Sequence, residues 1–137
     1  MRLTLFTDYG LRMLMRMASE PGRPFTTADF AAEFAVPRNH LIKIVQRLAR
    51  AGVVETRRGS GGGAMLAAPP EEIRLGAIVR LLEEEQAMVE CMGVGSNCRI
   101  ESCCRLKGRL RGAEAAFLAE LDRSTLADIA LPRFEFA

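Results

Sequence analysis

Residues 26–67 read TTADFAAEFAVPRNHLIKIVQRLARAGVVETRRGSGGGAMLA. The first half of this stretch predicts two helices joined by a short turn. Thr26 or Thr27 can cap the first helix, because a threonine hydroxyl accepts a hydrogen bond from a free N–H of the first turn. Residues 36–37, Val-Pro, interrupt the helical pattern, and proline is well suited to the start of the next helix. That helix is expected over residues 38–51, where a glycine follows. The short connection between the two fits a helix–turn–helix.

A β-hairpin is expected directly after these helices. Residues 53–57 and 64–67 are predicted to pair as two strands across a glycine-rich turn. Upstream, residues 7–19 carry apolar side chains at helical spacing, and Thr7 is a suitable cap. A helix, a helix–turn–helix and a hairpin in this order make a winged helix–turn–helix. We therefore assign residues 1–68 to a DNA-binding domain.

The second part of the chain, residues 69–137, is predicted to be helical around a cysteine-rich loop. A helix is expected over residues 75–85, a longer one over residues 102–121, and a short one over residues 124–129. The long helix has apolar residues every three or four positions, which favours packing against a second subunit over packing within its own domain. These residues are Leu106, Leu110, Ala113, Phe117 and Leu121. The expected fold class is mainly α with a small β-hairpin: a winged helix–turn–helix plus a long C-terminal dimerisation helix.

Composition excludes several classes of protein. With 137 residues, 49% of them hydrophobic, the chain suits one compact domain or a small domain with an extension. No apolar run approaches the roughly 18 residues of a membrane span, and the first residues lack the apolar core of a secretory signal. We therefore expect a cytoplasmic protein with no membrane partner. The single histidine, His40, leaves one candidate for a histidine general base.

Charge is distributed unevenly along the chain. Residues 1–66 hold 10 Lys/Arg and 5 Asp/Glu, a net charge of +5, whereas the remainder holds 9 and 12, a net charge of −3. A basic half joined to an acidic half favours nucleic-acid contact at one end and a different role at the other. An unevenly charged solvated surface is the alternative.

One face of the helix at residues 38–51 carries side chains suited to DNA. The opposite face should pack inward, and it carries Leu41, Ile44, Val45 and Leu48. Lysine and arginine bind phosphates, and asparagine, glutamine and arginine form bidentate contacts to base edges in the major groove. The helix contains no acid, although a merely solvated helix would carry more glutamate. We predict DNA contacts from Arg38, Asn39, His40, Lys43, Gln46, Arg47 and Arg50, with Arg57 and Arg58 at the hairpin tip.

All four cysteines of the chain, Cys91, Cys98, Cys103 and Cys104, lie within fourteen residues. In a cytosolic protein this clustering indicates metal, cluster or redox chemistry before structural disulfides. There is no C-x-x-C pair, so a zinc ribbon or a thioredoxin-like motif is a poor match. Adjacent Cys103 and Cys104 are difficult to direct at one site, so three cysteines plus a ligand from elsewhere are the better geometry for an iron–sulfur cluster. Free or oxidised thiols are the alternative.

Three segments form a pattern that is specific in combination: residues 6–12 (FTDYGLR), 38–44 (RNHLIKI) and 48–52 (LARAG). Together they resemble the Rrf-type winged-helix regulators. Cys98 with residues 104–107 (CRLK) resembles the cluster loop of the nitric-oxide-sensing repressors in that superfamily, and residues 117–122 and 125–128 resemble their C-terminal end. The resemblance covers nearly the whole chain.

The resemblance implies a homodimer with one iron–sulfur cluster per subunit. By position its ligands are Cys91, Cys98 and Cys104, with Asp8 donated by the other subunit. A 4Fe–4S cluster is favoured over 2Fe–2S, although the sequence does not fix the form. Two positions depart from the pattern: Cys103 is an additional thiol, and Lys107 stands where a related branch has a histidine ligand.

The function implied is that of a transcriptional repressor, not an enzyme. Two recognition helices read a palindromic operator in double-stranded DNA, and nitrosylation of the cluster by nitric oxide releases that DNA. An iron-availability-sensing regulator is the alternative, because residue chemistry does not decide between the two signals. A thiol redox protein or metal carrier using Cys103 and Cys104 is a third reading, which purification of a brown protein without oxygen would exclude.

Overall fold

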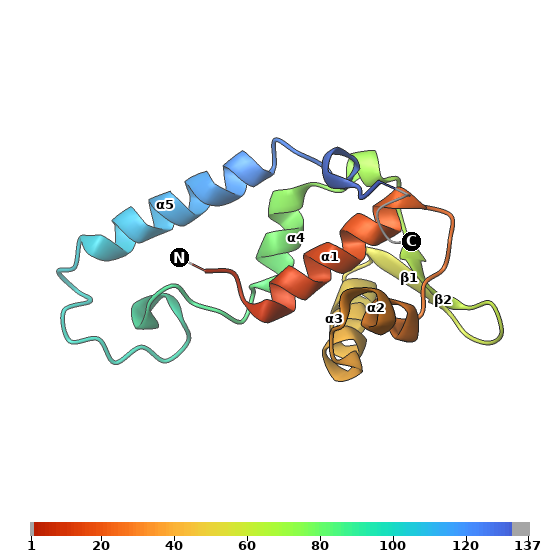
Figure 1. Cartoon of the computed structure of the whole chain (residues 1–137). Coiled ribbons are helices and arrows are strands. Elements are labelled where there is room, and N and C mark those ends of the chain that lie inside the picture. The colour runs from red at the N-terminus through yellow and green to blue at the C-terminus, as the bar shows by residue number, and fades with distance from the viewer. Residues whose placement is uncertain (1, 133–137) are drawn as a thin grey trace.

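A computed structural model describes residues 2–132 of the chain. Its helices are α1 (Leu5–Ser19), α2 (Thr27–Phe34), α3 (Arg38–Arg50), α4 (Leu75–Leu82) and α5 (Leu106–Leu121), its strands are β1 (Val54–Arg57) and β2 (Gly63–Leu66), and its short 3-10 turns are η1 (Pro70–Glu72), η2 (Glu90–Met92) and η3 (Leu126–Ile129). Figure 1 shows α1–α4 and the hairpin gathered in one body, with α5 reaching away from it. The expected fold class, mainly α with a small β-hairpin in a winged helix–turn–helix, is confirmed. None of the helices in the described part is both long and apolar enough to cross a membrane.

The helix–turn–helix forms where local sequence signals place it. At the start of α2, Thr26 accepts a hydrogen bond from the N–H of Asp29 (3.0 Å), and the Asp29 carboxylate accepts one from the N–H of Thr26 (2.8 Å). This reciprocal capping box satisfies two backbone donors. Ala35 ends α2 in the left-handed region (φ 52°), and Pro37 precedes α3. These signals set the turn that fixes α3 against α2.

One hydrophobic core joins the winged head to the helices that follow it. The fully buried side chains come from α1, α2, α3 and α4, from the segment before α2 and from η3; they include Leu14, Phe25, Phe30, Leu41, Ile44, Leu48, Ile78 and Leu126. Helices come close together at Gly10 of α1, where a Cβ atom would lie 2.7 Å from Leu82 Cδ1 and 3.4 Å from Ile44 Cγ2. A glycine here lets α1 pack closely against α4 and α3 at once.

The hairpin is anchored to the head by a third segment. Val54 pairs with Leu66 in an antiparallel register, and Phe25 exchanges two backbone hydrogen bonds with Ala64 (2.8 and 2.7 Å). Gly63 has a φ of 144°, and a Cβ there would lie 2.5 Å from the carbonyl oxygen of Phe25. The position of the wing is therefore tied to the segment that leads into α2.

The start of α1 and the end of α4 differ from the sequence prediction, and one contact joins them. Thr4, not Thr7, caps α1, and the helix begins at Leu5. The carboxylate of Glu83 accepts hydrogen bonds from the backbone N–H (2.6 Å) and the hydroxyl (3.0 Å) of Thr4. Helix α4 ends at Leu82, three residues before its expected end. Carboxylates are unfavourable at the C-terminal, negative end of a helix. The carboxylates of Glu83 and Glu85 contact Thr4 and Arg47 instead.

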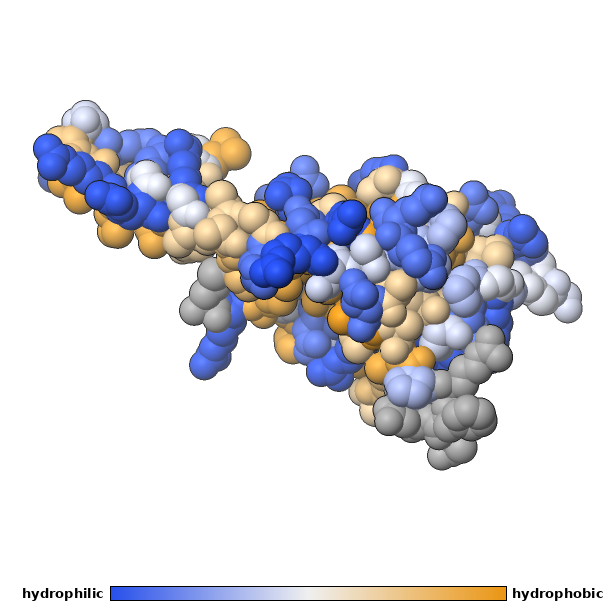
Figure 2. Space-filling view, turned by 90° about the horizontal axis from the view of Figure 1, so that it is seen from above, coloured by the Kyte–Doolittle hydropathy of each residue, from blue (hydrophilic) through white to orange (hydrophobic). Residues whose placement is uncertain are grey.

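Helix α5 also begins later than expected, at Leu106 instead of Ser102. Residues 99–103 lie in turns, in which the N–H of Cys103 donates to the carbonyl of Ile100 (3.1 Å). No residue of α5 is fully buried, and Leu106 is 59% exposed. Within the seam predicted on α5, Leu106 and Ala113 are exposed, whereas Leu110, Phe117 and Leu121 are half-buried because the helix packs along α4. Figure 2 shows hydrophobic and hydrophilic residues mixed on the surface of this projecting part.

Candidate nucleic-acid interface and metal centre

Helix α3 is amphipathic in the sense that the sequence predicts. Leu41, Ile44 and Leu48 are at most 1% exposed and anchor the helix in the core. The opposite face is open to solvent, with the side chains of Arg38, Asn39, His40, Lys43, Gln46 and Arg50 exposed. The face holds no acid of its own, so its potential is positive wherever other elements do not neutralise it.

Neighbouring elements hold the first turn of α3. The Nε of Arg38 donates a hydrogen bond to the hydroxyl of Thr27 (3.2 Å). The ring of His40 meets that of Tyr9 edge-on, with the centroids 5.8 Å apart. This turn is therefore fixed against α1 and α2 while its polar atoms stay accessible.

The hairpin tip presents two more cations. Arg57 and Arg58 are both exposed. Gly59 (φ 93°) and Gly61 (φ 75°) adopt left-handed conformations, which glycine occupies without strain. The tip is thereby compact, and it can approach a backbone phosphate closely.

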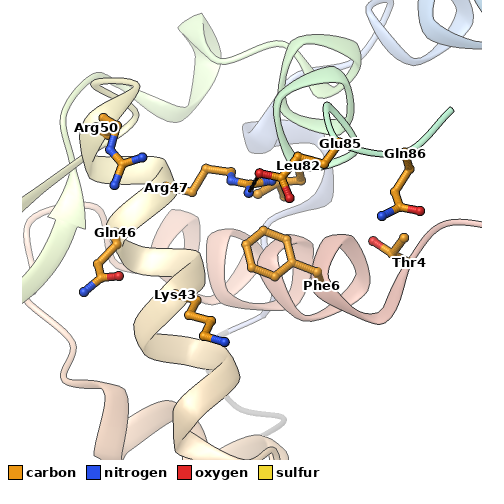
Figure 3. Close-up of a pocket in the computed structure, with 9 residues that line it drawn as sticks. All are labelled: Thr4, Phe6, Lys43, Gln46, Arg47, Arg50, Leu82, Glu85 and Gln86. Carbon is orange, nitrogen blue, oxygen red and sulfur yellow. Dashed lines mark hydrogen bonds and ion pairs between the residues drawn. The ribbon is translucent and has the colours of Figure 1, made fainter. Parts of the chain in front are cut away.

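Arg47 differs from the other predicted contacts on α3. Its Nη2 donates to the Oε1 of Glu85 at 2.8 Å, and its guanidinium carbon lies 4.8 Å from the centre of the Phe6 ring. Figure 3 shows Arg47 reaching from α3 toward Glu85 and Leu82, across a cleft of about 410 Å³ that Lys43 and Arg50 also line. Glu85 and Phe6 are functional neighbours that the sequence reasoning missed, because no local signal joins these distant segments.

The cysteine loop lies outside the core. Cys91, Cys98 and Cys104 are half-buried and Cys103 is exposed; all four are free thiols. Cys91 lies in η2, and Cys104 comes two residues before the first residue of α5. Within residues 2–132, no three His, Cys, Asp or Glu side chains are gathered as a metal site. The conformation of the single chain therefore does not bring the three candidate thiols together.

Asp8, the candidate ligand from a second subunit, is on the surface of α1. Its carboxylate accepts two hydrogen bonds from Arg12, at 3.1 and 2.8 Å, and the two side chains are 42% and 47% exposed. An exposed ion pair of this kind contributes at most about 1 kcal/mol. Asp8 is therefore available to another partner at little cost.

The donor set fits an iron–sulfur cluster by its chemistry. Thiolates are the preferred ligands of such clusters, and the three predicted here are unbridged and outside the core. Lys107 is not a candidate ligand, because its ammonium is ion-paired with Glu101. That ion pair holds the pKa of Glu101 below its usual value of 4.5. The resulting contact ties the first turn of α5 to the segment between Cys98 and Cys103.

The chain is similar to known transcriptional regulators. The family model described as "Rrf2: Iron-dependent Transcriptional regulator" matches residues 3–131. The HTH-type transcriptional regulator NsrR of Bacillus subtilis is 43% identical over 131 residues, which cover 94% of this chain and 90% of that protein.

Solved structures of two CymR proteins are also similar to this chain. The oxidised form of Staphylococcus aureus CymR is 29% identical with a TM-score of 0.72, and covers 95% of this chain and 96% of its own. CymR of B. subtilis, titled the global cysteine regulator of that organism, is 28% identical with the same TM-score and coverage.

Proposed function

The chain belongs to the Rrf2 family of transcriptional regulators, and from this premise we propose that it is a homodimeric repressor that releases its operator DNA in response to nitric oxide. The observation that carries the proposal is the 43% identity with NsrR over 94% of the chain. The iron–sulfur cluster, when bound, supplies iron that reacts with nitric oxide. The remaining roles fall to residues of this chain.

DNA binding is assigned to α3 and the hairpin. In a dimer, the two copies of α3 each enter the major groove of one half-site, and base contacts come from the exposed Asn39, Lys43 and Gln46. Arg57 and Arg58 contact flanking phosphates and strengthen binding without adding sequence information.

Dimerisation is assigned to α5. None of its apolar side chains is fully buried within the chain, and a groove of about 960 Å³ runs between α4, α5 and the N-terminal segment. Leu110, Phe117 and Leu118 of α5 line this groove together with Val79 of α4. A second copy of the chain covers these surfaces in the proposed dimer, since exposed apolar seams favour association.

The cluster ligands are proposed to be Cys91, Cys98 and Cys104 of one subunit and Asp8 of the other, with the 4Fe–4S form favoured. Asp8 exchanges its exposed partner Arg12 for iron. A carboxylate is a harder ligand than a thiolate and holds soft centres less tightly, so the link through Asp8 is the weakest of the four. Helix α1, which carries Asp8, packs against α3; the state of this link is therefore coupled to the DNA-reading helix.

The test is an anaerobic titration of the purified, reconstituted protein with nitric oxide, followed by absorbance and by binding to genomic operator DNA. Loss of the visible bands together with loss of DNA binding, at a few nitric oxide molecules per cluster, is the expected result. Unchanged DNA binding under nitric oxide would exclude the proposal.

The second candidate is an iron-availability sensor, favoured by the iron dependence in the description of the matched family. Such a protein keeps its DNA under nitric oxide and releases it when iron is chelated. The same titration, repeated with a chelator, separates the two.

A further inference from the structure

Glu85 reaches the DNA-reading helix from outside the helix–turn–helix. It lies three residues beyond the last residue of α4. Its side chain is 74% exposed and contacts Arg47. Among the four cations of α3, Arg47 is the one that forms an ion pair within the described residues. A single carboxylate from the turn after α4 thus neutralises one cation of an otherwise acid-free face.

The geometry leaves Arg47 poised between two acceptors. One face of its guanidinium is stacked over the Phe6 ring (4.8 Å), and this contact does not involve Glu85. Its bond to Glu85 uses one N–H of the five that a guanidinium carries. Lys43 and Arg50 line the same cleft. A DNA phosphate at the mouth of this cleft presents the same chemistry as the Glu85 carboxylate, with oxygen acceptors and negative charge.

We propose that Glu85 is an autoinhibitory carboxylate: it occupies Arg47 in place of a DNA phosphate and so limits the affinity of the protein for DNA. The proposal rests on the DNA-reading role given above to α3. Each phosphate that a protein neutralises steepens the salt dependence of binding by about 0.9 in the slope of log K against log salt. While Glu85 holds Arg47, this cation contributes neither affinity nor slope.

The exchange is feasible because the pair is weak. Glu85 is mostly exposed and Arg47 is 25% exposed, and exposed ion pairs are screened by salt and water. Phe6 keeps the guanidinium in place when the carboxylate is gone, so Arg47 stays ordered at the edge of α3. Loss of the Glu85 charge therefore frees a positioned cation and not a flexible one.

The test compares Glu85→Gln with the matched control Glu84→Gln. Both remove one negative charge from the same segment, but Glu84 has no ion pair within residues 2–132 and lines the groove beside α5 instead. Binding to a mixed-sequence duplex of about 30 base pairs, roughly three helical turns, is followed by fluorescence anisotropy at several salt concentrations. A second set carries Arg47→Ala alone and combined with Glu85→Gln.

We expect Glu85→Gln to tighten binding by up to about fivefold, the ratio that corresponds to the strongest exposed ion pairs, and to steepen the salt slope by about 0.9. Glu84→Gln should leave the slope unchanged. Arg47→Ala should abolish the gain that Glu85→Gln produces, because the freed cation is then absent. Equal effects of the two glutamine variants, or weaker binding by Glu85→Gln, would overturn the inference.

Lys43→Ala separates this inference from the proposed function. Lys43 is exposed on α3 and has no ion pair in the described part of the chain. If Lys43→Ala leaves DNA binding unchanged, α3 is not the reading helix, and the proposed function fails together with the inference. If Lys43→Ala weakens binding while Glu85→Gln behaves like Glu84→Gln, the inference alone is wrong.

Discussion

Replacement of Asp8 by alanine tests whether this residue links the cluster of one subunit to the head of the other. The structure predicts a small effect on stability. The Asp8–Arg12 pair is an exposed i,i+4 pair, which contributes about 0.3–0.5 kcal/mol, and an acid in the first turn of a helix adds about 0.3–1 kcal/mol. Asp8→Ala should therefore lower the free energy of unfolding by about 1 kcal/mol, a minor part of the roughly 5–15 kcal/mol typical of folded domains.

Arg12→Ala is the matched control. It breaks the same ion pair but leaves the carboxylate of Asp8 in place. Its cost to stability should be about 0.3–0.5 kcal/mol, because only the pair is lost. Urea unfolding of the two variants measures these differences directly and shows that both proteins are folded.

The functional readouts then separate the two variants. With three thiolates intact, Asp8→Ala should still bind a cluster, and its visible absorbance should resemble that of the native protein. Nitric oxide should lower the DNA affinity of Asp8→Ala less than that of the native protein. Arg12→Ala should keep most of the native decrease in affinity. A normal response of Asp8→Ala, at normal cluster content, would refute the link between subunits.

Three further predictions concern the fold that positions the site. Leu48→Ala, at a position that is 0% exposed, should lower the free energy of unfolding by about 2–5 kcal/mol, because it leaves a cavity under α3; urea unfolding measures this, and a loss under 1 kcal/mol would contradict the packing of α3. Gly76→Ala should cost about 1–3 kcal/mol by the same method, because its new Cβ would meet the backbone carbonyl of Leu118 and the carboxylate of Asp122 where α4 meets α5; a neutral result would mean that the two helices are not in close contact. The guanidinium of Arg16, and after it that of Arg23, holds the pKa of Glu20 below its usual 4.5, so these ion pairs stabilise the fold above that pH and the contribution is lost as the pH falls through the lowered value. Thermal unfolding of Glu20→Gln should therefore show a shallower loss of stability below pH 4.5, and a curve parallel to that of the native protein would disprove the assignment.

The helix–turn–helix could be predicted from sequence because its boundaries are set by neighbouring residues. The Thr26–Asp29 capping box, Pro37 before α3 and the glycine after it act within a few positions of the elements they define. Side-chain periodicity then identifies the buried face of α3, since Leu41 and Leu48 pack on one side whatever the neighbouring element is.

The ends of α1 and α4 could not be placed in this way. Thr4 and Thr7 are equally good caps by residue type, and the choice of Thr4 is reinforced by Glu83, 79 positions along the chain. The early end of α4 follows from the same contact, because a carboxylate that caps another helix is more stable there than at the C-terminus of its own. Both boundaries are set by one tertiary interaction, which no sequence window contains.

The start of α5 was misplaced for a local reason. Glu101 and Ser102 are residues that often begin helices, and they favour an early start. In the structure Glu101 is instead paired with Lys107, the second residue of α5, and residues 99–103 lie in turns. The predicted cluster ligands depend on a second chain as well, so no pattern within one sequence brings them into a single site.

On the cationic face of α3, side chains of the same charge differ in whether a carboxylate already pairs with them. Composition alone makes Lys43 and Arg47 equivalent candidates for phosphate contact, since both are positive and lie one helical turn apart on an acid-free helix. The fold makes them different. The turn after α4 places the Glu85 carboxylate 2.8 Å from Arg47, and the Phe6 ring of α1 lies 4.8 Å from the guanidinium carbon. Lys43 lines the same cleft without an acid partner in the described residues. A cation that is already paired with a carboxylate does not displace counterions from the DNA phosphates. The number of cations on a DNA-reading helix therefore overstates its contribution to affinity, because cations paired with carboxylates of other elements must be subtracted.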